Sequence, residues 1–289
     1  MISLGIDIGG GSVKVAALRD DRVLWTAQSA RYADPSAETI IGAIREVIAG
    51  REIEASNVGL CVPGILNEHQ TKIALSVNLP KLNGLPLADI AAVALGRTPA
   101  RLRIMNDTTA AAYDIYLGRK LSGRLFLMVL GTGVGVAVMD ATGPLRVDGD
   151  SPGHFGQMDV SIEGAPVIGP DGGAGSFEGY IGAPALVKMY GGDANALNAM
   201  KITDPSARAL ARAVRIAHAM YRPDHVVLAG GVGIRLSRLR DDLHAAVSHK
   251  LTSIARPEWT LSFGENDFHN AAGAARAVSV GSALADGHS

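Results

Sequence analysis

The same pattern of two apolar strands joined by a glycine-rich turn occurs twice in the chain. Near the amino terminus, Ile2–Ile8 leads into the turn Gly9-Gly10-Gly11-Ser12, and an alternating apolar segment follows it. The pattern returns where Leu125–Leu130 and 136–139 flank the turn at 131–135. Glycines let successive backbone N–H groups surround an anion, because no Cβ intervenes. The repetition predicts two related α/β halves, each opening with a hairpin whose turn can hold phosphate.

The first turn has the sequence of neither common nucleotide-binding loop. A dinucleotide-binding loop is G-x-G-x-x-G at the start of a helix, and a P-loop is G-x-x-x-x-G-K-[ST], whereas the turn at 9–12 lies between strands. By itself the turn could be no more than a tight hairpin. Asp7, however, leads into it, and a carboxylate beside bound phosphates needs a cation in between. Asp7 is therefore predicted to contact Mg²⁺, through water.

The composition is that of a globular protein with room for two domains: 289 residues, 47% of them hydrophobic and 19% charged. A net charge of −1 supports neither a nucleic-acid nor a membrane partner. The longest uncharged apolar stretch, 125–139, is shorter than a membrane span, and no leader pattern is present, so we expect a cytoplasmic protein. Because the chain has a single cysteine, Cys61, it cannot form an internal disulfide. We expect Cys61 to be a small buried hydrophobic residue.

Further elements alternate between strands and helices. Asp34-Pro35 resembles a helix start, and Gly50 marks the expected end. A buried strand at 58–62 runs into the Pro63-Gly64 turn, and a strand at 226–229 ends in glycines. Further helices are expected at 85–95, 205–221 and 236–250.

An Asn-Asp pair lies where a strand at 101–105 meets an Ala-rich helix that is expected to end near Gly118. Asp107 or Thr108 can cap this helix, and capping alone would account for the aspartate. The sequence, however, also contains three glycine-rich turns that follow strands. That combination favours a second role, as a general base.

The third glycine-rich turn is Gly230-Gly231-Val232-Gly233. A glycine pair at the end of a strand commonly allows close packing of strand and helix. It also provides a flat surface on which adenine or ribose could lie. Both interpretations remain open from the residues alone.

Taken in order, these segments resemble the ROK (repressor, open reading frame, kinase) sugar kinases of the actin, hexokinase and Hsp70 superfamily. The resemblance covers essentially the whole chain and implies an α/β, two-domain actin-like ATPase fold, related to ribonuclease H, with nucleotide in the cleft between domains. We expect a smaller domain of residues 1–106 plus a C-terminal helix at about 271–289, and a larger domain of 107–270. The family's repressors begin with a helix-turn-helix domain, whereas the first strand here begins at Ile2, so DNA binding is not expected.

The resemblance implies an ATP- and Mg²⁺-dependent kinase that phosphorylates a hydroxyl of a sugar or sugar-like polyol. Asp107 would take the hydroxyl proton, Asn106 would hold neighbouring hydroxyls, and the backbone N–H of Gly64 would help to seat the sugar. We also expect a homodimer. The implied nucleotide-binding residues are Gly9, Gly10, Gly11, Ser12, Lys14, Thr132, Gly133, Gly135, Gly230, Gly231 and Val232.

The family's structural zinc site is altered in this chain. Its signature is Gly-Glu-x-Gly-His followed by Cys-x-Cys-Gly-x-x-Gly-Cys-x-Glu, and the histidine and three cysteines bind the metal. Here Gly169, Asp171 and Ser176 stand at the cysteine positions, and Gln157 stands at the histidine position. A tetrahedral site needs about four N, S or O ligands, so no structural zinc is expected.

The same alteration affects the predicted sugar site. The family's glutamate and histidine contact the sugar near its anomeric end, and His154 and Gln157 replace them, while Glu178 is kept. We expect all three to bind substrate, and glucose to be a poor substrate, because the hydrogen-bonding groups at one end have changed. Alternatively, His154 and Gln157 only fill the space left by the missing zinc.

Two other functions remain open. The opening Gly-Ile-Asp-Ile-Gly-Gly-Gly-Ser-Val-Lys resembles polyphosphate glucokinases, which favours inorganic polyphosphate as phosphoryl donor. The altered sugar signature leaves room for a catalytically idle sugar-binding regulator of the same fold. Retention of Asp7, Asp107 and the glycine-rich turns argues against the regulator.

Overall fold

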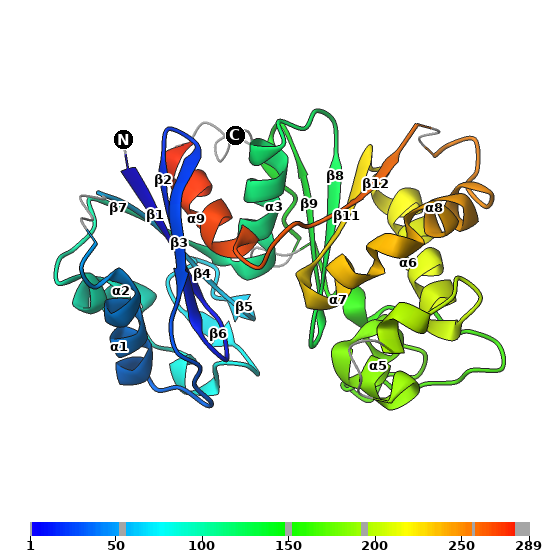
Figure 1. The fold of residues 1–289 in the computed structure, drawn as a ribbon, viewed down its shortest axis with the longest axis horizontal. Coiled ribbons are helices and arrows are strands. Elements are labelled where there is room, and N and C mark those ends of the chain that lie inside the picture. The colour runs from blue at the N-terminus through cyan, green and yellow to red at the C-terminus, as the bar shows by residue number, and fades with distance from the viewer. Residues whose placement is uncertain (1, 52–55, 148–151, 192–195, 256–257, 281–289) are drawn as a thin grey trace. The chain divides into compact units, whose positions relative to one another are not determined.

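The computed structural model describes residues 2–51, 56–147, 152–191, 196–255 and 258–280. Contacts divide the chain into two compact units: Met1–Ser122, Ala141–Ser151 and Phe268–Ser289 form the first, and Gly123–Asp140 and Pro152–Asp267 form the second (Figure 1). The sequence suggested a boundary after residue 106. The helix that follows this position falls within the first unit, where it packs on the C-terminal helix. Residues 281–289 of the expected C-terminal helix lie outside the described residues.

The first unit contains a sheet with strand order β3-β2-β1-β4-β7. Its first three strands in sequence pair antiparallel, and β4 and β7 continue the sheet in parallel with β1. The edge strand β3 was not predicted, because most of its residues are exposed and its apolar residues do not mark a buried face. The strands are β1 (Ile2–Ile8), β2 (Val13–Arg19), β3 (Arg22–Gln28), β4 (Asn57–Val62) and β7 (Arg101–Asn106).

The second unit repeats this topology. Its strands β8 (Leu125–Leu130), β9 (Val134–Asp140), β11 (His225–Ala229) and β12 (Thr260–Phe263) lie in the order β9-β8-β11-β12. An antiparallel hairpin is again followed by two parallel strands, as in β2-β1-β4-β7. The prediction of two related α/β halves, each opening with a hairpin, is confirmed.

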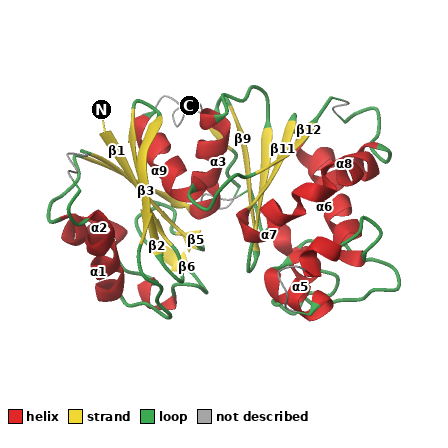
Figure 2. Cartoon of the chain, in the orientation of Figure 1, coloured by secondary structure: helices red, strands yellow, loops and turns green. Residues whose placement is uncertain are grey.

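Helices and short strands complete the two units (Figure 2). No helix within the described ranges is long and apolar enough to span a membrane. The helices are α1 (Ala37–Ile48), α2 (Leu87–Leu95), α3 (Asp107–Gly118), α4 (Phe177–Ile181), α5 (Ala183–Tyr190), α6 (Pro205–Tyr221), α7 (Gly230–Arg235), α8 (Arg240–Ser248) and α9 (His269–Ser279), and the short strands are β5 (Ile65–Leu66), β6 (Ile73–Leu75) and β10 (Gly143–Pro144).

Helix α1 begins two residues later than its sequence suggested. Ser36 is the N-cap, and its hydroxyl accepts a hydrogen bond from the backbone N–H of Thr39 at 3.3 Å. Asp34, the expected cap, has φ 46° and lies outside the helix. Serine and aspartate cap helices about equally well, so the local sequence did not discriminate between them.

The two faces of the first sheet are covered differently. Leu4, Ile6 and Ile8 of β1 belong to the same apolar cluster as residues of α1 and α2. Helix α9 packs on β1, β4 and β2, and also on α3. A Cβ at Gly5 would lie 1.8 Å from Ala271 O, and one at Gly59 would lie 1.9 Å from Ala274 O. Because these strand glycines have no side chain, the α9 backbone rests directly on the sheet.

Each unit contains one of the two tryptophans. Trp25, on β3, lies under the guanidinium of Arg51, 4.4 Å from the ring centroid. Trp259, in the second unit, stacks on His244 with 4.3 Å between ring centroids and meets His218 edge-on at 4.8 Å. Burial lowers the pKa of His218 to about 4, so this imidazole is neutral at physiological pH.

Candidate functional site

The predicted base Asp107, the predicted metal residue Asp7 and the predicted sugar-binding Asn106 lie near the carboxyl ends of three neighbouring parallel strands. In the β1–β4–β7 ladder, Asp7 pairs with Cys61 and Cys61 pairs with Met105. Asn106 and Asp107 follow Met105 directly, so the parallel register brings both toward the Asp7 edge of the sheet. Ligands of α/β proteins typically bind at this edge.

Asn106, at the end of β7, forms hydrogen bonds to the turn after β4 and to the first turn of α3. It is the N-cap of α3, and its side-chain oxygen accepts a hydrogen bond from the Thr108 N–H at 2.8 Å, so the expectation that Asp107 or Thr108 caps the helix was wrong. Its amide nitrogen donates to Gly64 O at 2.9 Å. Asp107 Oδ1 also accepts from the Thr108 N–H, at 2.7 Å. Asn106, Asp107 and Gly64, which were all predicted to meet the sugar, are therefore close together.

Gly64 has a backbone conformation that favours glycine. Its φ is 105°, and a Cβ there would lie 2.4 Å from Leu75 O. A side chain at this position would displace the carbonyl that Asn106 binds.

The two aspartates of the edge titrate at unusually high pH. Burial and, to a smaller extent, repulsion from Asp107 raise the pKa of Asp7 to about 7, while Lys14 acts in the opposite direction. Burial raises the pKa of Asp107 to about 6, against the effect of the hydrogen bonds from Thr108. A carboxylate with a pKa of about 6 is mostly ionised at neutral pH and a better proton acceptor than an ordinary aspartate.

The first glycine turn is fixed by residues that follow β2. Tyr32 Oη donates to Gly9 O at 2.7 Å, and the Tyr32 N–H donates to Gly11 O at 3.0 Å. Gln28 Nε2 donates to Ser12 Oγ at 2.8 Å. The sequence did not identify Tyr32 or Gln28, because β3 was not predicted and neither residue belongs to a recognisable motif. A Cβ at Gly11 would meet no atom within 4 Å, which leaves this side of the turn open.

Glu178 holds the second glycine turn. Its Oε2 accepts a hydrogen bond from the Val134 N–H at 3.0 Å. A Cβ at Gly133 or at Gly156 would lie 3.0 Å from the same oxygen. The turn itself closes through a Gly131 N–H bond to Gly133 O at 3.0 Å. Within the second unit, the structure therefore places Glu178 beside the predicted phosphate turn.

His154 precedes the short 3₁₀ turn Phe155–Gln157, Gln157 ends it, and both side chains are exposed. Phe155, one of the two buried residues between them, packs edge-on against Phe126, with 5.2 Å between ring centroids. Neither His154 nor Gln157 fills an interior space. Their contact with substrate stays a prediction.

The three positions that correspond to the family's zinc cysteines lie together. A Cβ at Gly169 would be 1.9 Å from Ser176 Oγ and 2.6 Å from Asp171 Oδ1. Ser176 caps α4 by accepting a hydrogen bond from the Gly179 N–H at 3.2 Å, and Asp171 Oδ1 accepts from the Gly173 N–H at 3.2 Å. Serine, aspartate and backbone groups thus close this turn by hydrogen bonding. The expected absence of structural zinc stays a prediction.

The third glycine segment forms the start of α7 rather than a free turn. Gly230 has φ 78°, and a Cβ there would lie 2.5 Å from Leu130 O. A Cβ at Gly233 would lie 3.0 Å from Leu228 C, so both glycines allow close packing. At Gly231 a Cβ would meet no atom within 4 Å. The packing interpretation therefore fits Gly230 and Gly233, and the open surface expected for adenosine fits Gly231.

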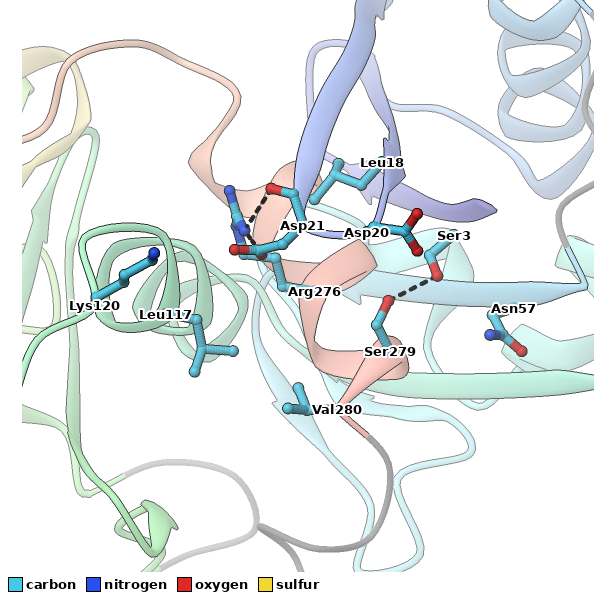
Figure 3. A pocket seen from close by; sticks show the side chains of 10 residues that line it. All are labelled: Ser3, Leu18, Asp20, Asp21, Asn57, Leu117, Lys120, Arg276, Ser279 and Val280. Carbon is cyan, nitrogen blue, oxygen red and sulfur yellow. Dashed lines mark hydrogen bonds and ion pairs between the residues drawn. The ribbon is translucent and has the colours of Figure 1, made fainter. Parts of the chain in front are cut away.

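A pocket of ≈ 420 Å³ lies at the other end of β1 (Figure 3). Ser3 and Ser279 line it and share a hydrogen bond of 2.7 Å, and Arg276 there forms an ion pair with Asp21. No predicted site residue lines this pocket. The predicted site residues up to Asp107 lie in the first unit, and those from Thr132 onward lie in the second.

Comparison with known proteins identifies relatives across nearly the whole chain. A family model described as "ROK family" matches residues 3–279. The N-acetyl-D-glucosamine kinase of Erwinia tasmaniensis is 27% identical over 293 residues, which cover 88% of this chain and 91% of that protein.

Solved structures show the same fold. A ROK family glucokinase from Streptomyces griseus, in complex with glucose and AMPPNP, gives a TM-score of 0.72 at 20% identity, covering 97% of this chain and 100% of that chain. A ROK hexokinase from Thermus thermophilus gives 0.69 at 21% identity, covering 97% and 98%. A ROK family transcriptional regulator, a homolog of the E. coli MLC protein, gives 0.77 at 16% identity, covering 99% and 79%. The predicted actin-like ATPase fold is confirmed.

Proposed function

The chain belongs to the ROK family, and from this premise we propose that it is an ATP-dependent kinase that phosphorylates a hydroxyl of a sugar or sugar-like polyol. One observation carries the proposal. Asp107 is a half-buried carboxylate with a pKa raised to about 6, close enough to Asp7 for the two charges to repel, at the carboxyl edge of the parallel strands. A protein that only binds sugar has no need of such a base.

In this proposal, Asp107 accepts the proton of the attacking hydroxyl. Phosphoryl transfer requires little of the protein beyond aligning the nucleophile with the γ-phosphate and balancing charge. Asn106, bonded to both Gly64 and the first turn of α3, is suited to hold a neighbouring hydroxyl. Asp107 and Asn106 would then both contact the substrate from the carboxyl end of β7.

Asp7 would hold Mg²⁺ through water. In phosphoryl-transfer sites this ion takes one or two carboxylates together with the substrate phosphates, rather than a cage of protein ligands. The described part of the chain contains no group of three or more His, Cys, Asp and Glu that could form such a cage. The single carboxylate of Asp7 fits a site in which substrate phosphates and water supply the other ligands. When bound, the ion would neutralise charge on the phosphates.

The nucleotide would be held by the glycine segments. The turns at 9–12 and 131–135 would bind the phosphates, and the open face at Gly231 would receive the adenosine. Tyr32 and Glu178 would keep the two turns in shape, because each is bonded to backbone atoms of its turn.

For the acceptor, an aminosugar is the best candidate. The Erwinia relative is an N-acetyl-D-glucosamine kinase, and His154 and Gln157 offer donors and acceptors that differ from a glutamate and histidine pair. A polar site with unmatched groups can reject a ligand by about 10⁴ or more, so glucose should be a poor substrate. Ketoses and cyclitols belong on the same panel.

A coupled ADP-release assay over sugars, aminosugars, ketoses and cyclitols tests the proposal. We expect the highest kcat/KM for a compound altered at or next to the anomeric centre, and activity that requires Mg²⁺. Glucose as the best substrate would refute the expected specificity. Transfer from inorganic polyphosphate releases no ADP, so the sugar phosphate is measured directly in that arm. Sugar phosphate formed from polyphosphate but not from ATP would identify the alternative donor. Sugar binding by calorimetry without turnover on either donor would favour a regulator.

A further inference from the structure

Asp7 is held by two donors that the proposed reaction has not yet used. Asn270 Nδ2, on α9, donates to Asp7 Oδ2 at 3.4 Å. Cys61 Sγ, on β4, lies 3.7 Å from Asp7 Oδ1 and 3.6 Å from Asn270 O, so its single proton is shared between these two acceptors. Asp7 is only 6% exposed. Within the first unit, Oδ2 therefore has an amide donor, and Oδ1 shares a thiol donor with the Asn270 carbonyl.

The strand glycines explain how Asn270 comes so close. Gly5 and Gly59 pair in register on β1 and β4, and both allow the α9 backbone to rest on the sheet. Two residues further along these strands, on the same face, lie Asp7 and Cys61. The first turn of α9 lies over this end of the face, and Asn270 is the residue there that reaches Asp7.

We propose that Asn270 is a positioning residue that orients the carboxylate of Asp7 toward the magnesium-bound phosphates, with the thiol of Cys61 as the second donor. The inference rests on the proposed function. An ionised carboxylate offers about four lone-pair sites, so two donors leave one or more on each oxygen for water. Losing a group that orients a metal-site side chain typically costs about 10-fold to 100-fold in metal affinity.

The test compares ADP binding with and without Mg²⁺ by calorimetry, for the full chain at mildly alkaline pH. The ratio of the two dissociation constants measures how strongly the protein uses the metal, without any turnover. For Asn270→Ala we expect this ratio to fall about tenfold, while ADP affinity without Mg²⁺ stays as in the wild type. An unchanged ratio in a folded Asn270→Ala protein would overturn the proposal.

Asn270→Asp separates positioning from packing, because it keeps the size of the side chain but replaces a donor with a carboxylate. A positioning role requires the ratio for Asn270→Asp to fall at least as far as for Asn270→Ala. A ratio restored by the isosteric aspartate would show that Asn270 only fills space. If one variant fails to fold, an unchanged ratio in the other still overturns the proposal, since both remove the donor.

Ser279→Ala is the matched control. It removes the 2.7 Å hydrogen bond between the same two elements, α9 and β1, at the end far from Asp7. Its ratio should equal that of the wild type, and a comparable fall would assign the effect to general loosening of α9. If the wild-type chain binds no ADP at all, the proposed function itself is wrong. If it binds ADP and turns over sugar while Asn270→Ala keeps the full ratio, only the inference is wrong.

Discussion

At the scale of single residues, Asp107 combines a proposed catalytic role with a cost to stability. Burial raises its pKa to about 6, so the folded protein carries an ionised group in a place that favours the neutral form. Proton linkage gives the effect on folding. When the pKa of a carboxyl is higher in the folded protein than in the unfolded chain, the free energy of unfolding decreases as the pH rises through the folded-state pKa. The feature that makes Asp107 a better base therefore makes it unfavourable for folding at neutral pH.

We expect Asp107→Asn to lower kcat by about 10²-fold to 10⁴-fold, which is the usual loss when a general base is removed. The variant should also have a higher Tm at neutral pH, because the amide carries no charge that the protein environment disfavours. Steady-state kinetics with the best substrate and a thermal melt measure the two effects on the same sample. Wild-type turnover in the variant would remove Asp107 from the mechanism.

The pH dependence of the reaction should report the same group. We expect kcat/KM to fall about tenfold for each pH unit below about 7, where protonation of Asp7 weakens metal binding, and more steeply below about 6, where the protonated Asp107 cannot accept the hydroxyl proton. An ordinary aspartate would give this fall only near its usual value of 3.8. A profile that stays flat down to pH 4, in a range where the protein remains folded, would contradict the assignment.

At the scale of elements, the fold depends on helices that touch strands without side chains between them. Gly5 and Gly59 allow this for α9 on the sheet, and Gly273 allows it for α9 on α3, where a Cβ would lie 1.7 Å from Ala110 O. Because the contacted atoms are backbone carbonyl oxygens, a side chain can be accommodated only by moving a whole element.

Gly59→Ala is expected to destabilise the protein by about 1–3 kcal/mol or more, the usual cost of overpacking a core. Gly42→Ala is the control: Gly42 lies in the middle of α1, is exposed, and has open space at the Cβ position. The control should be neutral or stabilising by about 0.5–1 kcal/mol, since alanine favours helix. Urea titrations of both variants compare the free energies of unfolding, and equal effects would show that the close contact is unimportant.

The region at 143–182 should need no metal. Hydrogen bonds of Asp171 and Ser176 close the turn where relatives are expected to bind zinc, so chelation should leave Tm unchanged. Elemental analysis of desalted protein should find far less than one zinc per chain. Stoichiometric zinc together with a lower Tm after chelation would refute this prediction.

At the scale of the whole molecule, the sequence predicted what depends on local pattern and missed what depends on distant contacts. The repeated hairpins could be predicted because apolar strands and glycine turns are visible in short windows. The edge strand β3 could not, because it buries no continuous face. Asn270 could not be linked to Asp7 because 263 positions separate them and only the close fit of α9 brings them together. Cys61 was correctly expected to be buried, but its hydrogen bond to Asp7 depends on strand register.

Nucleotide binding should involve both units. We expect AMPPNP with Mg²⁺ to slow amide hydrogen exchange at 9–12 in the first unit and at 131–135 in the second, because both turns are proposed to bind its phosphates. Exchange at α2, which contains none of the proposed nucleotide-binding residues, serves as the internal reference. Protection of one turn alone would show that the other glycine turn is only a hairpin.

The distribution of the tryptophans gives the protein an optical reporter for each half. Trp25 lies in the first unit, and Trp259, between two imidazoles, lies in the second. In a Trp25→Phe chain, the remaining emission follows the second half alone, while circular dichroism follows both. Comparing the two melting curves distinguishes halves that unfold in succession from halves that unfold in a single cooperative step. Intrinsic fluorescence can thus show whether the two halves unfold independently, and no dye has to be attached.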